Sequence, residues 1–304
     1  MAKLSLISIL SAVAILSLTG MAASRDLSDC ENGKVTATTG NQIAVTARGC
    51  PDASAGPSGK VHAPIPAKAM IKQDEALPEA DDLLPAVPST GSVMRAKDFV
   101  VLIKRPENAD GETLVLLHGS GGNETTLMSL AARIAPRSVL MGVRGRITQD
   151  GNKRWYRRLT PTSFDQGDIR HEAAAFADFL QDEVKAGSLD LDHTTFIGYS
   201  NGANLLAALT LLHPGLVERA VLLRPMSVLH KIPPTDLSPL RVLMVAGASD
   251  TTYVPFASAL ETMLRDHGAR IAAHTIKADH GLGKQDVKIV SEWLARSNAV
   301  SLNQ

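Results

Sequence analysis

A serine lies between two glycines in the stretch FIGYSNGANL, residues 196–205. An apolar run ends at the pentapeptide GYSNG, residues 198–202, and the residues that follow it have helical spacing. A strand, G-x-S-x-G and a helix in this order form the sharp turn that exposes a nucleophilic serine. The pattern therefore predicts that Ser200 is a nucleophile. The alternative is a serine between two glycines that only allow a strand and a helix to pack closely.

A serine hydroxyl becomes a good nucleophile when a base takes its proton and a third group orients that base. In this type of sheet the acid follows the serine, and the histidine follows the acid. Asp250 comes directly after the apolar run RVLMVAGAS, and His280 lies between the last predicted strand and the last predicted helix. The separations of 50 and 30 residues each leave room for one strand and one helix. We therefore expect Ser200, Asp250 and His280 to meet at one edge of the sheet.

Other residues compete for the roles of acid and base. Asp279 adjoins His280, but neighbouring side chains seldom reach each other in the geometry of an acid–imidazole hydrogen bond, so Asp250 is preferred. His267, at the end of a predicted helix, and His274, inside a predicted strand, are interpreted as structural. His213 and His230 follow no comparable strand end.

A glycine-rich segment, VLLHGSGGNETT at residues 115–126, follows another apolar run. A loop of this kind can direct a backbone N–H at a developing oxyanion, together with the N–H of the residue after the nucleophile. We assign these two donors to Ser120 and Asn201. A phosphate-binding loop is disfavoured, because the segment lacks the lysine of the G-x-x-x-x-G-K-[ST] pattern.

A basic block, RGRITQDGNKRWYRR at residues 144–158, contains six cations and one acid. One hypothesis is that it contacts an anionic or aromatic part of a substrate, since guanidinium groups suit carboxylates and phosphates. The other is a structural loop whose arginines bind backbone carbonyls and acids such as Asp165 and Asp168. Both remain open. The candidates for substrate contact are Arg144, Arg146, Trp155, Tyr156 and, after a later strand, Arg224.

Short apolar runs alternate with longer helical patterns over residues 93–304. The expected strands are Phe99–Ile103, Thr113–Leu117, Val139–Val143, Thr194–Ile197, Ala220–Leu223, Val242–Ala246 and Ile271–Ile276. The expected helices are Thr125–Ile134, Ile169–Lys185, Asn201–Leu212, Val254–Arg265 and Gln285–Arg296. Runs that are apolar throughout suit a parallel sheet covered by helices on both faces. The pattern predicts one three-layer α/β domain with its chemistry at the carboxyl ends of the strands.

The first 24 residues have the pattern of a secretory signal peptide. One early lysine precedes an uncharged run of 15 residues, Leu4–Leu18, and small residues follow it. This run is shorter than the roughly 20 residues needed to span a bilayer, so an uncleaved anchor is the weaker interpretation. We expect a periplasmic or secreted protein with no stable membrane span after cleavage.

Residues 25–92 are expected to form an N-terminal segment and linker ahead of the catalytic domain at 93–304. The stretch 51–92 is rich in proline, alanine and serine and shows no sustained apolar period. The chain's two cysteines, Cys30 and Cys50, would lie in an oxidising compartment, so a disulfide closing a hairpin is predicted. Two free thiols in a disordered tail are the alternative.

Charge and composition exclude several classes of partner. The 31 basic residues balance the 31 acidic ones, so no global excess indicates a nucleic acid or an anionic membrane. No cluster of histidines and cysteines has metal-binding spacing, and the predicted serine chemistry needs neither a metal nor an organic cofactor. The sequence assigns no oligomeric state.

Six segments together resemble the α/β-hydrolase superfamily, and within it the bacterial phospholipase/carboxylesterase group of small serine esterases. They are LHGSGG, VRGRITQDGNKRWYRR, GYSNGAN, LLRPM, AGASD and DHGLG. The resemblance covers roughly residues 97–297, and its most specific part is the block 143–158 followed by GYSNGAN and LLRPM. The first 95 residues differ from the family, and the segments around the acid and the base are looser versions of its pattern.

The resemblance implies an α/β-hydrolase fold and hydrolysis of carboxylic esters by a serine triad, with a small-molecule ester as the expected substrate. The family's triad matches Ser200, Asp250 and His280, and its oxyanion donors match Ser120 and Asn201. A thioesterase or acyltransferase with the same triad is one alternative function. A catalytically silent binding protein of the envelope is an alternative of another class.

Overall fold

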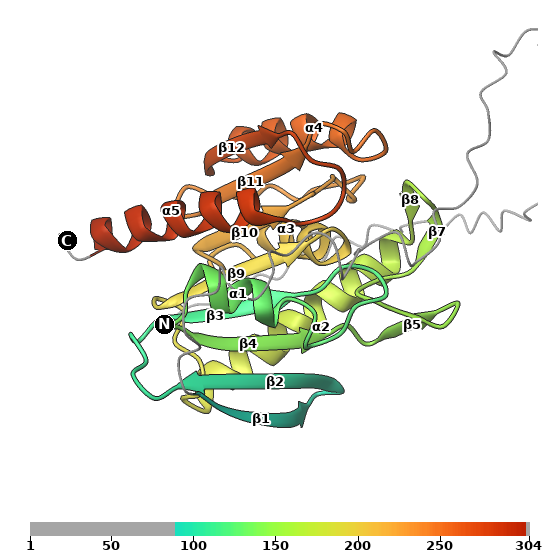
Figure 1. The fold of residues 1–304 in the computed structure, drawn as a ribbon. Helices are drawn as coiled ribbons and strands as arrows, with labels where there is room; N and C mark the ends of the chain where they lie inside the picture. The colour runs from blue at the N-terminus through green and yellow to red at the C-terminus, as the bar shows by residue number, and fades with distance from the viewer. Residues whose placement is uncertain (1–88, 302–304) are drawn as a thin grey trace, which may run out of the picture. The chain divides into compact units, whose positions relative to one another are not determined.

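An eight-stranded sheet forms the centre of the computed structural model, which describes residues 89–301 (Figure 1). The strand order is β1-β2-β4-β3-β9-β10-β11-β12. Its strands are β1 (Ser89–Ala96), β2 (Phe99–Pro106), β3 (Thr113–Leu117), β4 (Val139–Arg144), β9 (Thr194–Tyr199), β10 (Arg219–Leu223), β11 (Arg241–Gly247) and β12 (Arg270–Ile276). β2 runs antiparallel to both β1 and β4, and all other neighbours are parallel. The predicted mostly parallel sheet is therefore confirmed.

Five helices cover the two faces of this sheet, as predicted. They are α1 (Met128–Ile134), α2 (Gln166–Lys185), α3 (Asn201–Leu212), α4 (Val254–Asp266) and α5 (Lys284–Ser301). α2, α3 and α4 bury Phe176, Leu206 and Leu264 in a core on one face. α1 and α5 bury Leu130 and Trp293 in a second core on the other face (Figure 1). The three-layer α/β architecture is thus confirmed.

The apolar runs explain why the central strands form where they do. β9 and β10 are buried at every position, which only a strand covered on both faces allows. α3 is likewise buried at all but its last residue, so its sequence is apolar on every side. The turn between β9 and α3 is therefore fixed between two deeply buried elements.

Some elements were not predicted. β1 begins at Ser89, within the stretch interpreted as linker, and a two-residue turn at Lys97 and Asp98 joins it to β2. Both turn residues have positive φ, 46° and 67°, although the sequence lacks the glycine typical of such turns. The basic block and the residues after it form two further hairpins. One pairs β5 (Ile147–Gln149) with β6 (Asn152–Arg154), and the other pairs β7 (Arg158–Thr160) with β8 (Ser163–Phe164). Both hairpins lie beyond the end of β4 in Figure 1.

The predicted signal peptide over residues 1–24, the Cys30–Cys50 disulfide and most of the predicted linker lie outside the described residues. Over residues 89–301, none of the helices combines the length and the apolar character that crossing a membrane requires.

Candidate active site

The turn that carries Ser200 has a strained backbone. Ser200 lies between the end of β9 and the start of α3 with φ 50° and ψ −114°, a combination that residues with a Cβ rarely adopt. Its N–H donates to the Leu223 carbonyl at 2.8 Å, which fixes the turn against β10. The residue is 6% exposed and lines a small pocket.

The two flanking glycines allow backbones to approach closely. A Cβ on Gly198 would lie 2.6 Å from the Cα of Ala203, and one on Gly202 would overlap the Leu117 carbonyl oxygen. Close packing therefore explains both glycines. It does not explain the positive φ of Ser200, which directs a side chain into the pocket at the cost of strain.

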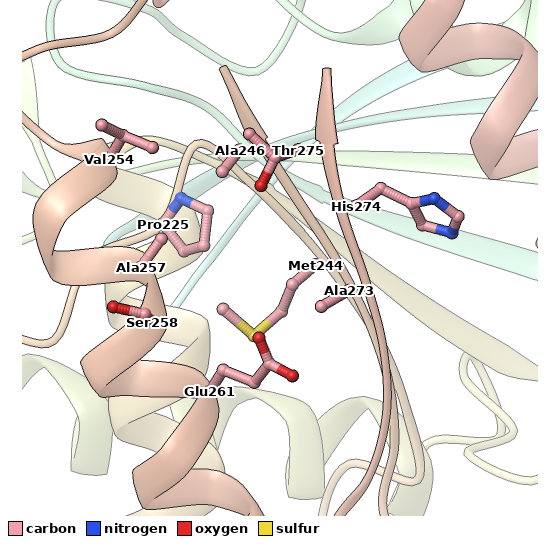
Figure 2. Close-up of a pocket in the computed structure, with 10 residues that line it drawn as sticks. All are labelled: Pro225, Met244, Ala246, Val254, Ala257, Ser258, Glu261, Ala273, His274 and Thr275. Atoms are coloured by element: carbon pink, nitrogen blue, oxygen red, sulfur yellow. The ribbon is translucent and has the colours of Figure 1, made fainter. Parts of the chain in front are cut away.

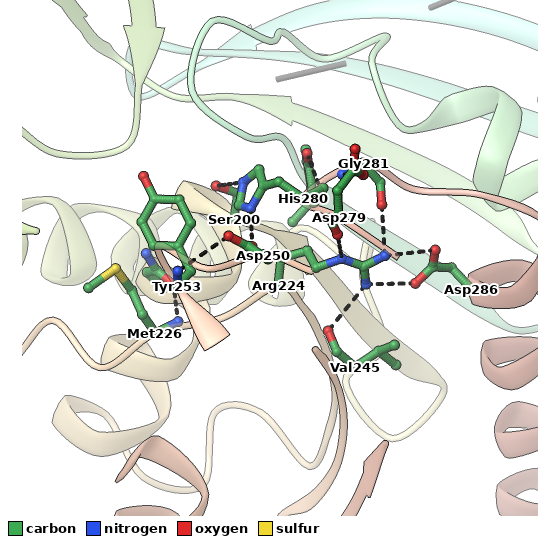
Figure 3. Close-up of polar contacts among 12 residues, drawn as sticks. Ser200, Arg224, Met226, Val245, Asp250, Tyr253, Asp279, His280, Gly281 and Asp286 are labelled. Atoms are coloured by element: carbon green, nitrogen blue, oxygen red, sulfur yellow. Dashed lines mark hydrogen bonds and ion pairs between the residues drawn. The ribbon is translucent and has the colours of Figure 1, made fainter. Parts of the chain in front are cut away.

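His280 lies between Ser200 and Asp250, within hydrogen-bond distance of each (Figure 3). His280 Nε2 is 2.9 Å from Ser200 Oγ, and His280 Nδ1 is 2.5 Å from Asp250 Oδ2. Because an ionised carboxylate can only accept, Nδ1 carries the proton and Nε2 is free to accept from the serine hydroxyl. Asp279, the rival acid, instead accepts from the Gly281 N–H at 2.8 Å.

Arg224, whose side chain is fully buried, fixes the loop that carries His280. The guanidinium donates to the carbonyls of Asp279 at 2.9 Å and Gly281 at 2.7 Å (Figure 3). It also forms a two-pronged ion pair with Asp286 at the start of α5, at 2.8 and 3.1 Å. The predicted substrate contact of Arg224 is therefore corrected, because these partners occupy its donors and make it a support of the loop.

A second hydrogen bond fixes the same loop. The Tyr199 hydroxyl donates to the His280 carbonyl at 3.0 Å, and the rings of Tyr253 and His280 lie 4.8 Å apart between centroids. Tyr199 directly precedes the nucleophile, so the serine turn and the histidine loop are connected by a single side chain.

The predicted oxyanion donors lie beside the nucleophile. Ser120, Asn201 and Ser200 line the same small pocket, which has a volume of about 10 Å³. Within residues 89–301, neither the Ser120 nor the Asn201 backbone N–H donates a hydrogen bond to another group. Asn201 is the first residue of α3, where a helix leaves its N–H groups without partners. Both donors are thus available to a ligand at Ser200.

His118, to which the sequence analysis assigned no role, fixes the oxyanion loop. Its Nε2 accepts from the Gly145 N–H at 2.9 Å, so its Nδ1 carries the proton and donates to the Gly119 carbonyl at 2.6 Å. Burial lowers the pKa of His118 to about 4, so the ring is neutral at pH 7. This histidine therefore ties the loop after β3 to the loop after β4.

Arg144 and Arg146, two candidates for substrate contact, have acidic partners instead. Arg144 forms a two-pronged ion pair with Glu124, and its hydrogen bond lowers the pKa of that carboxyl. Arg146 pairs with Glu172 of α2 at 2.9 Å and lies 5.0 Å from the centre of the Phe99 ring. Their predicted substrate contact is corrected in favour of the structural alternative.

The acids named in that alternative make different contacts. Asp165 caps α2 by accepting from the N–H groups of Gly167 and Asp168, both at 3.0 Å. Asp168 accepts from the Arg157 backbone N–H at 2.6 Å. Asp165 therefore stabilises the start of α2 and Asp168 the backbone at Arg157, while Glu124 and Glu172 bind the arginine side chains.

The two aromatic candidates differ in position. Trp155 is 1% exposed and packs against Phe176, and its Nε1 donates to the His118 carbonyl at 2.9 Å, so its predicted substrate contact is corrected to a core position. Tyr156 lines the pocket at Ser200, and its hydroxyl accepts from Asn204 Nδ2 at 3.1 Å. Burial raises the pKa of Tyr156, so its hydroxyl remains protonated.

A larger cavity, of about 200 Å³, lies elsewhere, between α4 and the strands β11 and β12 (Figure 2). Met244, Glu261 and His274 are among the residues that line it, and the His274 ring points away from the other two in Figure 2. Ser200, Asp250 and His280 are not among the residues that line this cavity. We therefore assign the candidate active site to the smaller pocket at Ser200. In the part of the chain that the structure describes, no group of three or more acidic, histidine or cysteine side chains could hold a metal.

Comparisons with known proteins identify the family. Residues 99–298 match the phospholipase/carboxylesterase family. A carboxylesterase structure from Mesorhizobium loti is 48% identical, with a TM-score of 0.65 over 67% of this chain and 98% of that one. The Bacillus cereus carboxylesterase is 28% identical, with a TM-score of 0.60 over 68% of this chain and 94% of that one. MhqD of Bacillus subtilis (strain 168) is 33% identical over 181 residues, which are 59% of this chain and 90% of that protein. The chain therefore belongs to the phospholipase/carboxylesterase family of the α/β-hydrolase superfamily, a family of serine hydrolases that act on esters.

Proposed function

We propose that the protein hydrolyses carboxylic esters through an acyl-enzyme formed on Ser200. The observation that supports this most strongly is the continuous chain of contacts from Ser200 Oγ through His280 to Asp250, at 2.9 and 2.5 Å. The nucleophile, base and acid already have the order and geometry that the reaction needs.

In the first half of the reaction, Ser200 Oγ attacks the ester carbonyl while His280 Nε2 takes its proton. Asp250 stabilises the imidazolium through Nδ1–H, and the N–H groups of Ser120 and Asn201 donate to the tetrahedral oxyanion. Collapse of this intermediate breaks the bond to the alcohol oxygen, which receives the proton from His280. The alcohol leaves, and the acyl group remains on Ser200.

In the second half, water replaces the alcohol. His280 takes a proton from the water as it attacks the acyl carbonyl, and the same two N–H groups stabilise the second oxyanion. His280 then returns the proton to Ser200 Oγ as the ester bond to the enzyme breaks. The carboxylic acid leaves, and the starting enzyme is restored.

The test is labelling by a fluorophosphonate together with turnover of p-nitrophenyl acetate. Wild type is expected to be labelled and active, while Ser200→Ala loses labelling and about 10⁴-fold or more of kcat. Ser129→Ala, at an exposed serine of α1, is the matched control and retains both. A folded wild type that is neither labelled nor active would contradict the proposal. An acyl thioester and an alcohol acceptor, tested alongside, separate ester hydrolysis from thioester hydrolysis and acyl transfer.

We also propose that the mature protein is exported, on the basis of the apolar run Leu4–Leu18 and the small residues after it. Fractionation of expressing cells, followed by N-terminal sequencing, is expected to find a shortened chain in the periplasm or medium. A full-length chain in the cytoplasm would contradict export. Mass analysis with and without reductant tests the disulfide proposed between Cys30 and Cys50.

A further inference from the structure

The pocket at Ser200 contains a buried arginine that has no acidic partner. Arg154, the last residue of β6, is 5% exposed and lines the pocket. Its Nη1 donates to Ser120 Oγ at 2.7 Å, and its Nε has no hydrogen-bond partner among the described residues. Asp150, the one acid of the basic block, forms no ion pair with it within residues 89–301. Burial lowers the pKa of Arg154, as expected for a cation without a balancing charge.

The other buried arginines show that this is an exception. Arg219 pairs with Glu112 at 2.8 Å, and Arg224 pairs with Asp286 at 2.8 Å. Fully buried charges in proteins are normally paired, because an isolated charge loses its hydration without compensation. Arg154 retains this cost in the folded chain, beside the nucleophile. A ligand anion would remove it.

A second arginine extends the positive charge along the pocket wall. Arg158 of β7 is half-buried and lines the same pocket, and its guanidinium forms no ion pair with any residue from 89 to 301. Gln149 fixes its backbone, because the Gln149 amide donates to the Arg158 carbonyl at 2.8 Å and accepts from its N–H at 3.0 Å. No aspartate or glutamate lines the pocket, whose other polar groups are hydroxyls and amides.

We propose, on the basis of the ester hydrolysis proposed above, that the substrate carries a carboxylate, which Arg154 and Arg158 bind while Ser200 attacks the ester carbonyl. Arginine donates in a fork that matches the two oxygens of a carboxylate. Because both arginines line the same pocket as Ser200, the carboxylate is expected to lie only a few atoms from the scissile bond. The carboxylate can belong to the acyl part or to the alcohol part of the ester.

The experiment compares charged and neutral esters of similar length. Monoethyl succinate against ethyl pentanoate tests a carboxylate on the acyl side, and 3-acetoxypropanoate against butyl acetate tests one on the alcohol side. For at least one pair, wild type is expected to have a kcat/KM about tenfold or more in favour of the charged ester, since hydrogen bonds to charged groups contribute roughly that much each.

The arginine variants then assign this preference to residues. Arg158→Gln and Arg154→Met are each expected to reduce the ratio of charged to neutral kcat/KM about tenfold, mainly through KM. Arg157→Gln, at an exposed neighbour of the same segment, is the matched control and keeps the wild-type ratio. Arg158 is only half-buried, so its variant tests the proposal even where Arg154→Met fails to fold.

Failure of this inference differs from failure of the proposed function. Turnover of p-nitrophenyl acetate with no preference for either charged ester, or a preference that Arg157→Gln reduces as strongly as Arg158→Gln, would overturn the carboxylate site. If p-nitrophenyl acetate is not turned over, the proposed function fails, and calorimetry of monoethyl succinate and 3-acetoxypropanoate with Ser200→Ala tests the arginines alone. Binding of at least one that Arg158→Gln weakens about tenfold supports the site, and equal binding overturns it.

Discussion

Two groups of arginines lie at the carboxyl edge of the sheet, and they differ in whether a carboxylate meets them. Arg144, Arg146 and Arg224 each form a two-pronged ion pair. Arg154 and Arg158 form none within the described part of the chain, and both line the pocket at Ser200. Residue type and sequence neighbourhood do not separate the groups, since four of the five arginines lie within the same 15-residue block. The groups differ instead in whether an acidic side chain pairs with the arginine.

The difference follows from the elements that the arginines face. The paired group meets acids from the turn before α1, from α2 and from the start of α5, which are Glu124, Glu172 and Asp286. The unpaired group comes from the strands β6 and β7, and no acid lines the pocket that both strands border. The paired arginines support the loops of the site, and the two arginines without an acidic partner among residues 89–301 are those to which the proposed carboxylate would bind.

Among the variants that test this comparison, Arg224→Met is expected to change the free energy of unfolding the most. Arg224→Met leaves the buried Asp286 carboxylate without its counter-charge and two loop carbonyls without their donor, so the free energy of unfolding is expected to fall by about 3–5 kcal/mol. Urea unfolding measures this loss. Arg224→Met combined with Asp286→Leu is expected to recover part of it, because no charge then remains buried. A double variant no more stable than the single one would show that the carbonyl contacts matter more than the pair.

The next effect concerns His118, which supports a loop without carrying charge. Its pKa falls from 6.5 in the unfolded chain to about 4 in the folded protein, so below pH 6.5 the unfolded chain binds a proton that the folded protein does not. Stability is therefore lost as the pH falls from 6.5 to 4, by about 3 kcal/mol in total. His118→Gln keeps a donor and an acceptor but is expected to lose this dependence. Urea unfolding at pH 7, 5.5 and 4.5 checks it, and parallel pH profiles for the two proteins would contradict it.

A smaller effect is expected at Arg144, whose pair with Glu124 is partly exposed. Its side chain is 31% exposed, so water screens the pair and Arg144→Met is expected to cost about 1 kcal/mol of unfolding free energy. Thermal unfolding at two salt concentrations measures it. If the loss is as large as that of Arg224→Met, exposure does not rank the supporting arginines, and the comparison needs another basis.

The smallest effect is expected where the charge is unpaired. Arg158→Gln is expected to change the free energy of unfolding by no more than about 0.5 kcal/mol, and Arg154→Met is expected to leave it unchanged or to raise it by about 1 kcal/mol, because it removes a buried charge without a partner. Urea unfolding in the absence of ligand checks both. A loss near 3 kcal/mol at either position would show that the residue supports the fold and would remove the distinction between the groups.

The sequence predicted the sheet strands from β2 onward from their continuous apolar runs, and all five helices from their helical spacing. Both patterns are local, so they can be recognised without knowledge of the packing. The sequence also predicted that Ser200, Asp250 and His280 would meet, because each follows a strand and parallel strands end at one edge. It could not predict β1, whose sequence STGSVMRA has little apolar pattern and a turn at Lys97 and Asp98 without glycine.

The partners of the arginines were beyond the reach of the sequence. Arg144 and Glu124 are 20 residues apart, Arg146 and Glu172 are 26 apart, and Arg224 and Asp286 are 62 apart, so only the packing of helices on the sheet brings them together. Arg154 was missed as a pocket residue because nothing local distinguishes it from its neighbours. The role of His118 had one signal, a histidine at a strand end beside a glycine, but its acceptor role depends on the Gly145 N–H, 27 residues away.

The positive φ of Ser200 has a consequence for how this position can evolve. A strain of about 1–3 kcal/mol is a substantial share of the 5–15 kcal/mol by which a typical domain is stable. Selection for folding alone would favour glycine at this position, because glycine adopts such backbone angles without penalty. Family members that have lost hydrolysis are therefore expected to have glycine there more often than alanine, which a survey of their sequences can check. The serine persists only under continuing selection for its hydroxyl.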